Sequence, residues 1–108
     1  MTIYVDSAMI PASVPNGPRV HTSRWCHLMS DRLDPVELHR FAQTIGLRRA
    51  WFQSKPGNPV HDHYDLTLSK RAQAVRYGAV EIDQVEMGDL LTRRRALWAA
   101  ARAGVSHG

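Results

Sequence analysis

The stretch from Trp51 to Arg71, W-F-Q-S-K-P-G-N-P-V-H-D-H-Y-D-L-T-L-S-K-R, decides the expected fold. Its first residues are apolar and predict a β-strand over Arg49 to Gln53, and near its end Ser69 is expected to cap a helix. Two prolines, one glycine and a compact H-D-H-Y-D cluster lie between these elements and predict a loop. Ionisable side chains on loops between regular elements are commonly functional. The stretch therefore predicts a strand-to-helix connection that carries a site.

The segments on either side predict further strands and helices. Ile3, Tyr4 and Val5 form a continuous apolar run, which is typical of a strand buried on both faces. The sequence D-P-V-E at 34–37 combines a capping residue, a proline suited to the first turn and a glutamate three residues after the cap. The expected elements are strands at 2–5, 49–53 and 79–82, helices at 34–45, 70–77 and 84–103, an irregular segment at 7–23 and a helical turn at 23–29.

This order of elements predicts a small single α/β domain over residues 1–108. Strands that alternate with helices favour parallel pairing, so we expect a mostly parallel sheet of three or more strands with flanking helices and a frayed tail at 104–108. One cysteine, Cys26, excludes an internal disulfide and a cysteine zinc cluster, and it fits a reducing compartment. No signal peptide and no apolar run of about 20 residues is present, so a cytoplasmic protein is expected.

The charge balance is basic, with a formal net charge of +4 and a pI near 9.8. Such a balance favours anionic partners such as nucleic acid, nucleotides or acidic protein surfaces. In the last helix, four arginines either complement the helix dipole or form an anion-binding patch. Leu97 and Trp98 of that helix either pack on the sheet or form the seam of a homodimer. The four arginines are Arg93, Arg94, Arg95 and Arg102.

Polar residues close the three predicted strands: Asp6, Gln53 and Asp83. In an open α/β sheet, ligands bind outside the carboxyl ends of the strands, so these positions are candidates for a site. For Asp6 the alternative is a turn formed with Ser7.

Two histidines outside the central stretch also have two interpretations each. His27 and Asp31 lie four residues apart, which on a helix places them side by side, either as a local hydrogen bond or as part of a site. His39 lies beside the predicted core stripe of its helix. It is either a residue bordering the core or a ligand-binding residue.

A metal site is the first chemistry that the H-D-H-Y-D cluster suggests. In an extended segment alternate residues share a face, so His61, His63 and Asp65 would point the same way. Imidazole and carboxylate ligands suit Zn, Mn or Fe. The pattern is similar to the metal-binding signature of metallo-β-lactamase-type hydrolases. However, Leu66 stands where that signature has another histidine, and the chain is too short for that fold.

Acid–base or phosphate chemistry is the second possibility. His63 can exchange a proton near neutral pH, and Asp65 could orient it. Lys70 and Arg71 stand at a predicted helix N-terminus, where free N–H groups attract anions. The alternative is that Asp65 and Ser69 only shape the turn and that Arg71 is a solvated surface charge.

A set of short segments over residues 3 to 85 also carries a resemblance. They are I-Y-V-D at 3–6, W-C-H-L at 25–28, S-D at 30–31, E-L-H-R-F-A at 37–42, I-G-L at 45–47, W-F-Q at 51–53, H-Y-D at 63–65, S-K-R-A at 69–72 and G-A-V-E at 78–81. In this order they resemble a bacterial and phage family catalogued as domain of unknown function 4031. The resemblance implies no activity. It implies that His63, Tyr64 and Asp65 belong to a shared motif and that His61 lies in a variable insert.

Two functions follow as hypotheses. The first is a hydrolase acting on a nucleotide or nucleic-acid phosphoester, in which His63 is the general acid or base and Arg71 holds the phosphate. The second is a non-catalytic module, of phage origin, that captures a nucleotide, a nucleic acid or a protein through the basic last helix. The catalytic candidates are His63, Asp65, His27 and Asp6, with Asp65 and Asp6 orienting groups or binding a divalent metal; the binding candidates are Arg71, Lys70, Gln53, Tyr64, Asp31 and His39.

Overall fold

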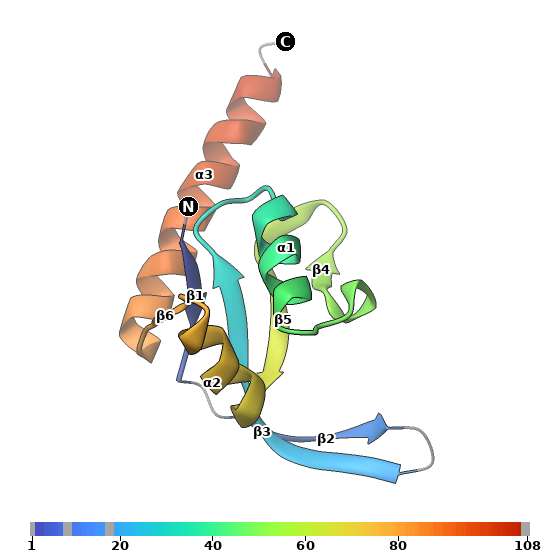
Figure 1. Ribbon diagram of the computed structural model, residues 1–108. Helices are drawn as coiled ribbons and strands as arrows, with labels where there is room; N and C mark the ends of the chain where they lie inside the picture. Colours follow the sequence, from blue (N-terminus) through green and yellow to red (C-terminus); the bar gives the residue numbers. More distant parts are fainter. Residues whose placement is uncertain (1, 8–9, 17–18, 107–108) are drawn as a thin grey trace.

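A computed structural model describes residues 2–7, 10–16 and 19–106 (Figure 1). Three α-helices, six strands and one 3-10 turn are assigned in these ranges. In chain order the elements are β1 (Ile3–Val5), β2 (Ile10–Asn16), β3 (Arg19–Ser30), α1 (Val36–Thr44), the 3-10 turn (Arg49–Trp51), β4 (Gln53–Lys55), β5 (Asn58–Thr67), α2 (Leu68–Arg76), β6 (Val80–Glu81) and α3 (Gln84–Ser106).

The strands form one sheet in the order β4-β5-β3-β1-β6, and β2 pairs with β3 outside this path. β1 pairs in parallel with β6, whereas β1–β3, β2–β3, β3–β5 and β4–β5 are antiparallel. The predicted α/β class is therefore correct, but the expectation of a mostly parallel sheet is wrong. The physical reason is that consecutive strands are joined by hairpins at β2–β3 and β4–β5, which invert direction without a crossover helix.

The first hairpin occupies the region predicted to be irregular. Residues 10–16 pair with residues 19–25, and β3 then continues to Ser30. Pro11 and Pro15 had argued against a strand. They are accommodated because β2 is an edge strand, where a missing N–H need not remove a ladder bond. The predicted helical turn at 23–29 is also wrong, since Cys26 and Leu28 are buried and His27 between them is not, an alternation typical of a strand.

The second hairpin contains the H-D-H-Y-D cluster, for which the sequence predicts a loop. Lys55 pairs with Asn58 across Pro56 and Gly57, and Gly57 has a φ of +75°, a conformation that glycine adopts without strain. Arg49–Trp51 form a 3-10 turn in place of the predicted strand, which begins only at Gln53. The cluster therefore lies inside β5, the ten-residue return strand of the hairpin.

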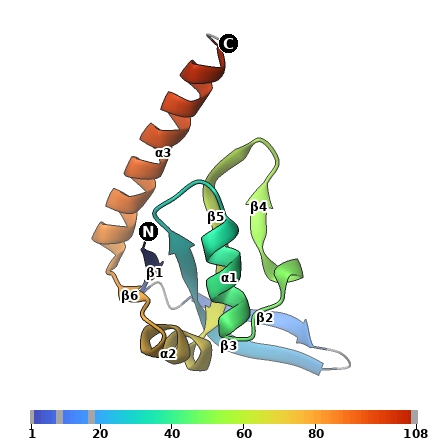
Figure 2. The ribbon, with the colours of Figure 1, turned by 45° about the horizontal axis from the view of Figure 1, so that its top comes forward.

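Helices cover both faces of the sheet (Figures 1 and 2). α1 and α2 pack on one face over the main core, whereas the N-terminal part of α3 packs on the other face through Met87 and Leu90 against Met29 and Ile82. The main core contains Ile3, Val5, Cys26, Leu28, Leu38, Ala42, Ile45, Leu47, Tyr64, Leu66, Ala74 and Ala79.

The predicted helices are present with shifted ends. The N-cap of α1 is Pro35 and not the predicted Asp34, although the Asp34 carboxylate accepts a hydrogen bond from the Val36 backbone N–H at 3.0 Å. α2 begins at Leu68, two residues earlier than expected, because Thr67 and not Ser69 accepts the bond from the Lys70 N–H. α3 continues to Ser106, beyond the predicted end at residue 103, and its C-terminal part extends past the sheet (Figure 2). The rest of the predicted frayed tail, 107–108, lies outside the described residues.

Arg94 is not part of the cationic surface predicted for α3. Arg94 is 1% exposed, and its guanidinium donates hydrogen bonds to the backbone carbonyls of four residues. These carbonyls belong to Ser30, Arg32, Pro59 and Val60. Arg94 therefore joins α3 to the end of β3 and the start of β5. Among the described residues, no helix combines the length and the apolar character needed to cross a membrane.

Candidate functional site

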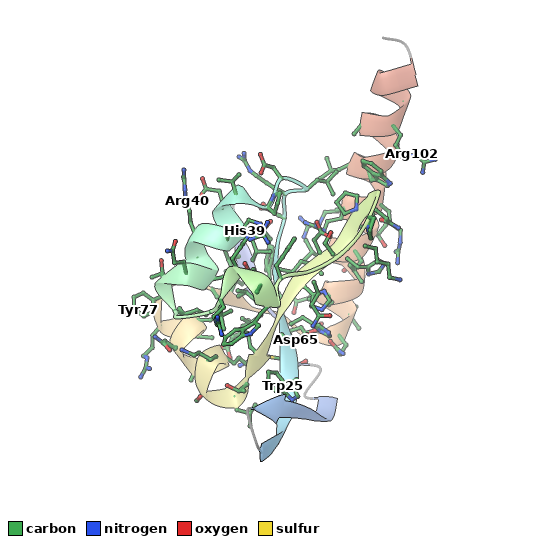
Figure 3. The ribbon with its side chains drawn as sticks, turned by 90° about the vertical axis from the view of Figure 1, so that its right-hand side faces the viewer. Trp25, His39, Arg40, Asp65, Tyr77 and Arg102 are labelled. Atoms are coloured by element: carbon green, nitrogen blue, oxygen red, sulfur yellow. The ribbon has the colours of Figure 1, made fainter. Side chains whose placement is uncertain are left out.

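Strand pairing brings three ionisable side chains into one row across the sheet. His27 of β3 lies directly opposite Asp65 of β5, so the two side chains share a face. Asp6 follows β1, and its backbone N–H donates to the His27 carbonyl at 3.2 Å, which extends the row on the other side. His63 precedes Asp65 by two residues in β5 and shares its face. This face is opposite to the one that α1 covers, where His39 and Arg40 are seen in Figure 3.

Asp6 holds His27 through two hydrogen bonds. The Asp6 carboxylate is 1% exposed, accepts from the His27 backbone N–H at 2.8 Å and lies 2.6 Å from the His27 ring nitrogen Nδ1. A carboxylate is an acceptor, so Nδ1 carries the proton in this pair. The other ring nitrogen, Nε2, then presents a lone pair, which is the arrangement found in histidines that bind metals.

His63 is oriented in the same way by the backbone. Its Nδ1 lies 2.6 Å from the His61 carbonyl oxygen and must donate to it. Its Nε2 lies 3.2 Å from Asp65 Oδ1. If the ring is neutral, Nε2 carries no proton, and two hydrogen-bond acceptors, Nε2 and Asp65 Oδ1, face each other. This arrangement requires a positive charge between the two atoms or beside them, either a proton on Nε2 or a metal ion.

The pKa of His63 reflects this arrangement. Burial lowers the pKa, but the hydrogen bonds to the Asp65 carboxylate and the His61 carbonyl, together with the charges of Asp65 and Asp6, outweigh burial and raise it above its usual value. His63 therefore keeps its proton to a higher pH than a free imidazole does.

Three ligand atoms, one each from His27, His63 and Asp65, lie within 4.8 Å of one another. The two imidazole rings meet edge to face with centroids 4.9 Å apart. Two histidines and one carboxylate form the set that binds Fe(II) in non-haem oxygenases, and the same donors suit Zn or Mn. The structure thus groups His27, and not His61, with His63 and Asp65.

An outer partner orients each of the three candidate ligands. Asp6 holds His27, the His61 carbonyl holds His63, and the Gln53 amide donates from Nε2 to Asp65 Oδ2 at 2.5 Å. Partners of this kind fix ring orientation and ligand basicity in metal sites. The donor set and its supports therefore fit a divalent cation.

We predict that Asp6→Asn lowers the affinity for Zn²⁺ or Mn²⁺ by about 10- to 100-fold. The asparagine amide would present N–H groups to His27 Nδ1, move the ring proton to Nε2 and remove the lone pair from the site. Isothermal titration calorimetry measures the affinity, and near-UV circular dichroism checks that the variant is folded. Asp89→Asn, an exposed position on α3, is the control; equal affinities for Asp6→Asn and wild type would contradict the assigned role.

The predicted cationic residues of α2 are held by the protein itself. Arg71 donates from Nε to the Asp6 carbonyl at 2.9 Å and pairs with Glu81 at 2.8 Å. Lys70 donates from Nζ to the Ile45 carbonyl at 2.6 Å, at the C-terminal end of α1. Arg71 therefore supports the backbone that carries Asp6, and Lys70 caps a helix.

Three predicted binding residues lie away from His27, His63 and Asp65, which are called the histidine cluster from here on. Tyr64 is buried on the α1 side of β5, where its hydroxyl hydrogen-bonds to His39 Nδ1 at 2.8 Å. Asp31 accepts from the Thr2 backbone N–H at 3.0 Å and so fixes the start of β1, rather than pairing with His27. The structure brings together Asp6, His27, Gln53, His63 and Asp65 and leaves Tyr64, His39 and Asp31 outside this group.

Cys26 neighbours His27 in sequence but points into the main core. Burial, and to a smaller extent the Asp6 carboxylate, raises the pKa of its thiol to about 11. We therefore expect native protein to react with a thiol reagent at pH 8 about 100-fold more slowly than unfolded protein, because the reactive thiolate is scarce. Absorbance with Ellman's reagent, with and without guanidinium chloride, measures both rates. Rapid labelling of the native protein would show that Cys26 is accessible and refute this placement.

Sequence reasoning missed a pocket between β5 and α3. Its volume is about 270 Å³. The spacing of arginine and tryptophan on α3 was visible in the sequence, but the contact of these side chains with β5 depends on tertiary packing. The lining residues are Asn58, Val60, His61, Arg95, Trp98, Ala99 and Arg102.

Comparison with family models gives one match, to a protein family of unknown function, DUF4031, over residues 3–94. Comparisons with curated proteins and with solved structures found no match. The matched range covers β1 to β6 and the first half of α3, and so includes every residue of the histidine cluster. The chain therefore belongs to the DUF4031 family.

Proposed function

We propose that the protein is a divalent-metal-dependent hydrolase of phosphoesters in nucleotides or nucleic acids. The observation that supports this proposal is the convergence of His27, His63 and Asp65 with an outer partner behind each of them. Three protein ligands leave further coordination positions open, as in catalytic rather than structural metal sites.

A bound divalent ion would polarise a phosphoryl oxygen and lower the pKa of a bound water. In this proposal His27 and His63 hold the ion through Nε2, and Asp65 holds it through a carboxylate oxygen. Gln53 keeps the second Asp65 oxygen in place. His63 is therefore proposed as a metal ligand instead of a general acid or base.

The proposal also assigns the phosphate contact to a residue other than Arg71. The Nε and one terminal nitrogen of Arg71 already serve Asp6 and Glu81, so Arg71 is proposed as a positioning residue. His61 lies two residues before His63 on the same face of β5, and Arg95 lines the same pocket as His61. Arg95 is therefore better placed than Arg71 to contact the phosphate of a substrate. The buried free thiol of Cys26 fits a reducing cytoplasm, which is part of the proposal.

The test is hydrolysis of bis(p-nitrophenyl) phosphate, nucleotides and short oligonucleotides by protein freed of metal with EDTA. We expect no turnover without metal and turnover after addition of Mn²⁺, Zn²⁺ or Fe²⁺. Asp65→Asn should remove the activity, whereas Asp89→Asn should keep it. Stoichiometric metal binding without turnover of any phosphoester would refute the hydrolase and favour the non-catalytic binding module.

A further inference from the structure

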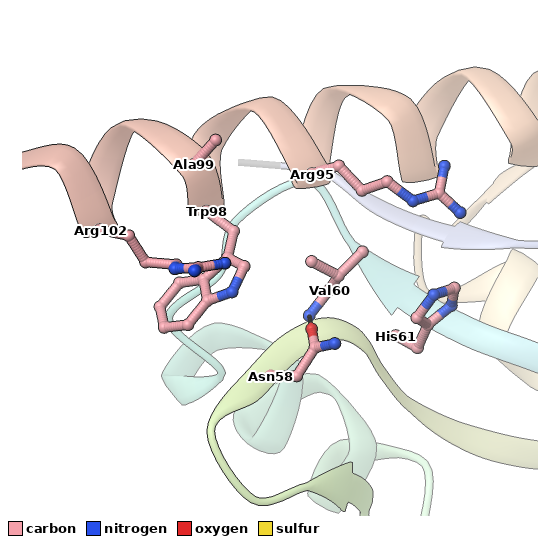
Figure 4. Close-up of a pocket in the computed structure, with 7 residues that line it drawn as sticks. All are labelled: Asn58, Val60, His61, Arg95, Trp98, Ala99 and Arg102. Atoms are coloured by element: carbon pink, nitrogen blue, oxygen red, sulfur yellow. Dashed lines mark hydrogen bonds between the residues drawn. The ribbon is translucent and has the colours of Figure 1, made fainter.

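The pocket between β5 and α3 combines an aromatic ring with several cations (Figure 4). Trp98 and Arg102 lie toward one end and Arg95 and His61 toward the other, with Asn58 of β5 between the two ends. The Arg102 guanidinium lies 5.9 Å from the centroid of the Trp98 ring. The pocket therefore presents an aromatic ring with the Arg102 guanidinium over it and with Arg95 at the opposite end.

The surroundings of the pocket are electrostatically one-sided. None of its seven lining residues is acidic, and residues 90–106 of α3 include four arginines and no aspartate or glutamate. The pocket thus favours an anionic occupant, and its volume of about 270 Å³ is close to the lower end of the range for small-ligand sites.

We propose that this pocket binds one base of a single-stranded nucleic acid. Trp98 stacks on the base, while Arg95 and Arg102 contact the phosphates on its two sides. Aromatic platforms flanked by cations bind single strands in this way, with little dependence on sequence. Asn58 supplies an amide that can donate to and accept from the base edge.

The position of the pocket links it to the metal candidate site. His61, His63 and Asp65 are alternate residues of β5 and share one face, so the pocket and the histidine cluster follow each other along the strand. Successive positions on one face of a strand are about 7 Å apart. In one respect this inference rests on the proposed function. If the protein is the proposed hydrolase, a nucleic-acid strand held on Trp98 can lie with its backbone over the histidine cluster, which makes nucleic acid the substrate class.

Fluorescence anisotropy of labelled twelve-residue oligo(dT) and oligo(U) tests the proposal, with the full chain in EDTA so that metal plays no part. We expect binding that weakens steeply between 50 and 200 mM NaCl, because phosphate contacts release counterions. Trp98→Ala should weaken binding about 10- to 100-fold and Trp98→Phe much less, because stacking survives in phenylalanine. The two oligonucleotides show whether the pocket prefers DNA or RNA.

Two charge-matched variants separate the pocket from general basicity. Arg95→Ala should weaken binding and reduce the salt slope by roughly 0.7, whereas Arg93→Ala removes the same charge outside the pocket lining and should leave affinity nearly unchanged. Equal losses for the two variants, or wild-type affinity of Trp98→Ala, would overturn the proposal. Sedimentation that shows a dimer dissociated by Trp98→Ala would also overturn it, since the pocket would then be an interface between two copies of the chain.

The outcome is separable from that of the proposed hydrolase. The oligonucleotide titration is carried out in EDTA, so its result does not depend on metal bound at the histidine cluster. Tight binding without hydrolysis under any metal would refute the hydrolase and leave the pocket assignment standing. Metal-dependent hydrolysis of bis(p-nitrophenyl) phosphate without oligonucleotide binding would refute the pocket assignment alone.

Discussion

Replacing His63 with alanine is expected to lower the affinity for Zn²⁺ or Mn²⁺ by about 100-fold or more, since loss of an outer partner alone costs 10- to 100-fold. The variant should remain folded with little change in melting temperature. Its side chain is 20% exposed and lies on the sheet face opposite the main core. Calorimetric titration measures the affinity, and thermal unfolding followed by circular dichroism measures the stability.

His61→Ala is the matched control for this experiment. His61 lies two residues away on the same face of β5 and is exposed, but it is outside the group of three ligand atoms. The His61→Ala variant should bind metal as the wild type does. If both alanine variants lost metal equally, the binding would be adventitious. If His63→Ala kept its affinity and melted several degrees lower, His63 would be a structural residue and the metal site would be refuted.

Replacing Arg94 with methionine is expected to have the largest effect on stability, a loss of about 3–5 kcal/mol. Methionine keeps much of the side-chain length but leaves the carbonyl oxygens of Ser30, Arg32, Pro59 and Val60 without their donor. Hydrogen bonds from a charged donor are worth more than neutral ones, and unpaired buried carbonyls add a desolvation cost.

Urea denaturation followed by circular dichroism measures this loss. Arg93→Met is the control, because Arg93 is exposed on the same helix and its replacement should change the free energy of unfolding by less than about 0.5 kcal/mol. Arg94→Lys should lie between the two, since an ammonium keeps the charge but lacks the planar fork that reaches several carbonyls. A methionine variant as stable as the control would mean that the guanidinium only replaces water at these carbonyls.

Local signals in the sequence predicted the helices well. α1 follows from a capping aspartate, a first-turn proline and an apolar stripe, all within twelve residues, and Gly46 ends it with a φ of +81°. The strands were harder, because polar residues and prolines fill β2 and β5. Those strands form because partners distant in the sequence pair with them, which no local pattern reports. The sheet was expected to be mostly parallel because the predicted strands alternate with helices, and no local pattern reported the two hairpins that reverse the chain.

The histidine cluster was partly predictable even though the topology was wrong. Asp6 was singled out because it follows a predicted strand, His27 by its spacing from Asp31, and His63 and Asp65 by their place in the H-D-H-Y-D cluster. The structure brings these four residues together. Tyr64 was grouped with them by adjacency in sequence. In a strand, adjacent residues face opposite sides, and this alternation separates Tyr64 from its two neighbours.

The buried Arg94 has a consequence for ligand length. It joins α3 to the first residues of β5 through the Pro59 and Val60 carbonyls, so the helix cannot slide along the strand that carries His61 and His63. These hydrogen bonds therefore help to fix the distance from Trp98 to the histidine cluster. Under the two proposals above, a mononucleotide would occupy one of the two sites and an oligonucleotide would span both, so the length of the nucleic acid would become a criterion of ligand selection.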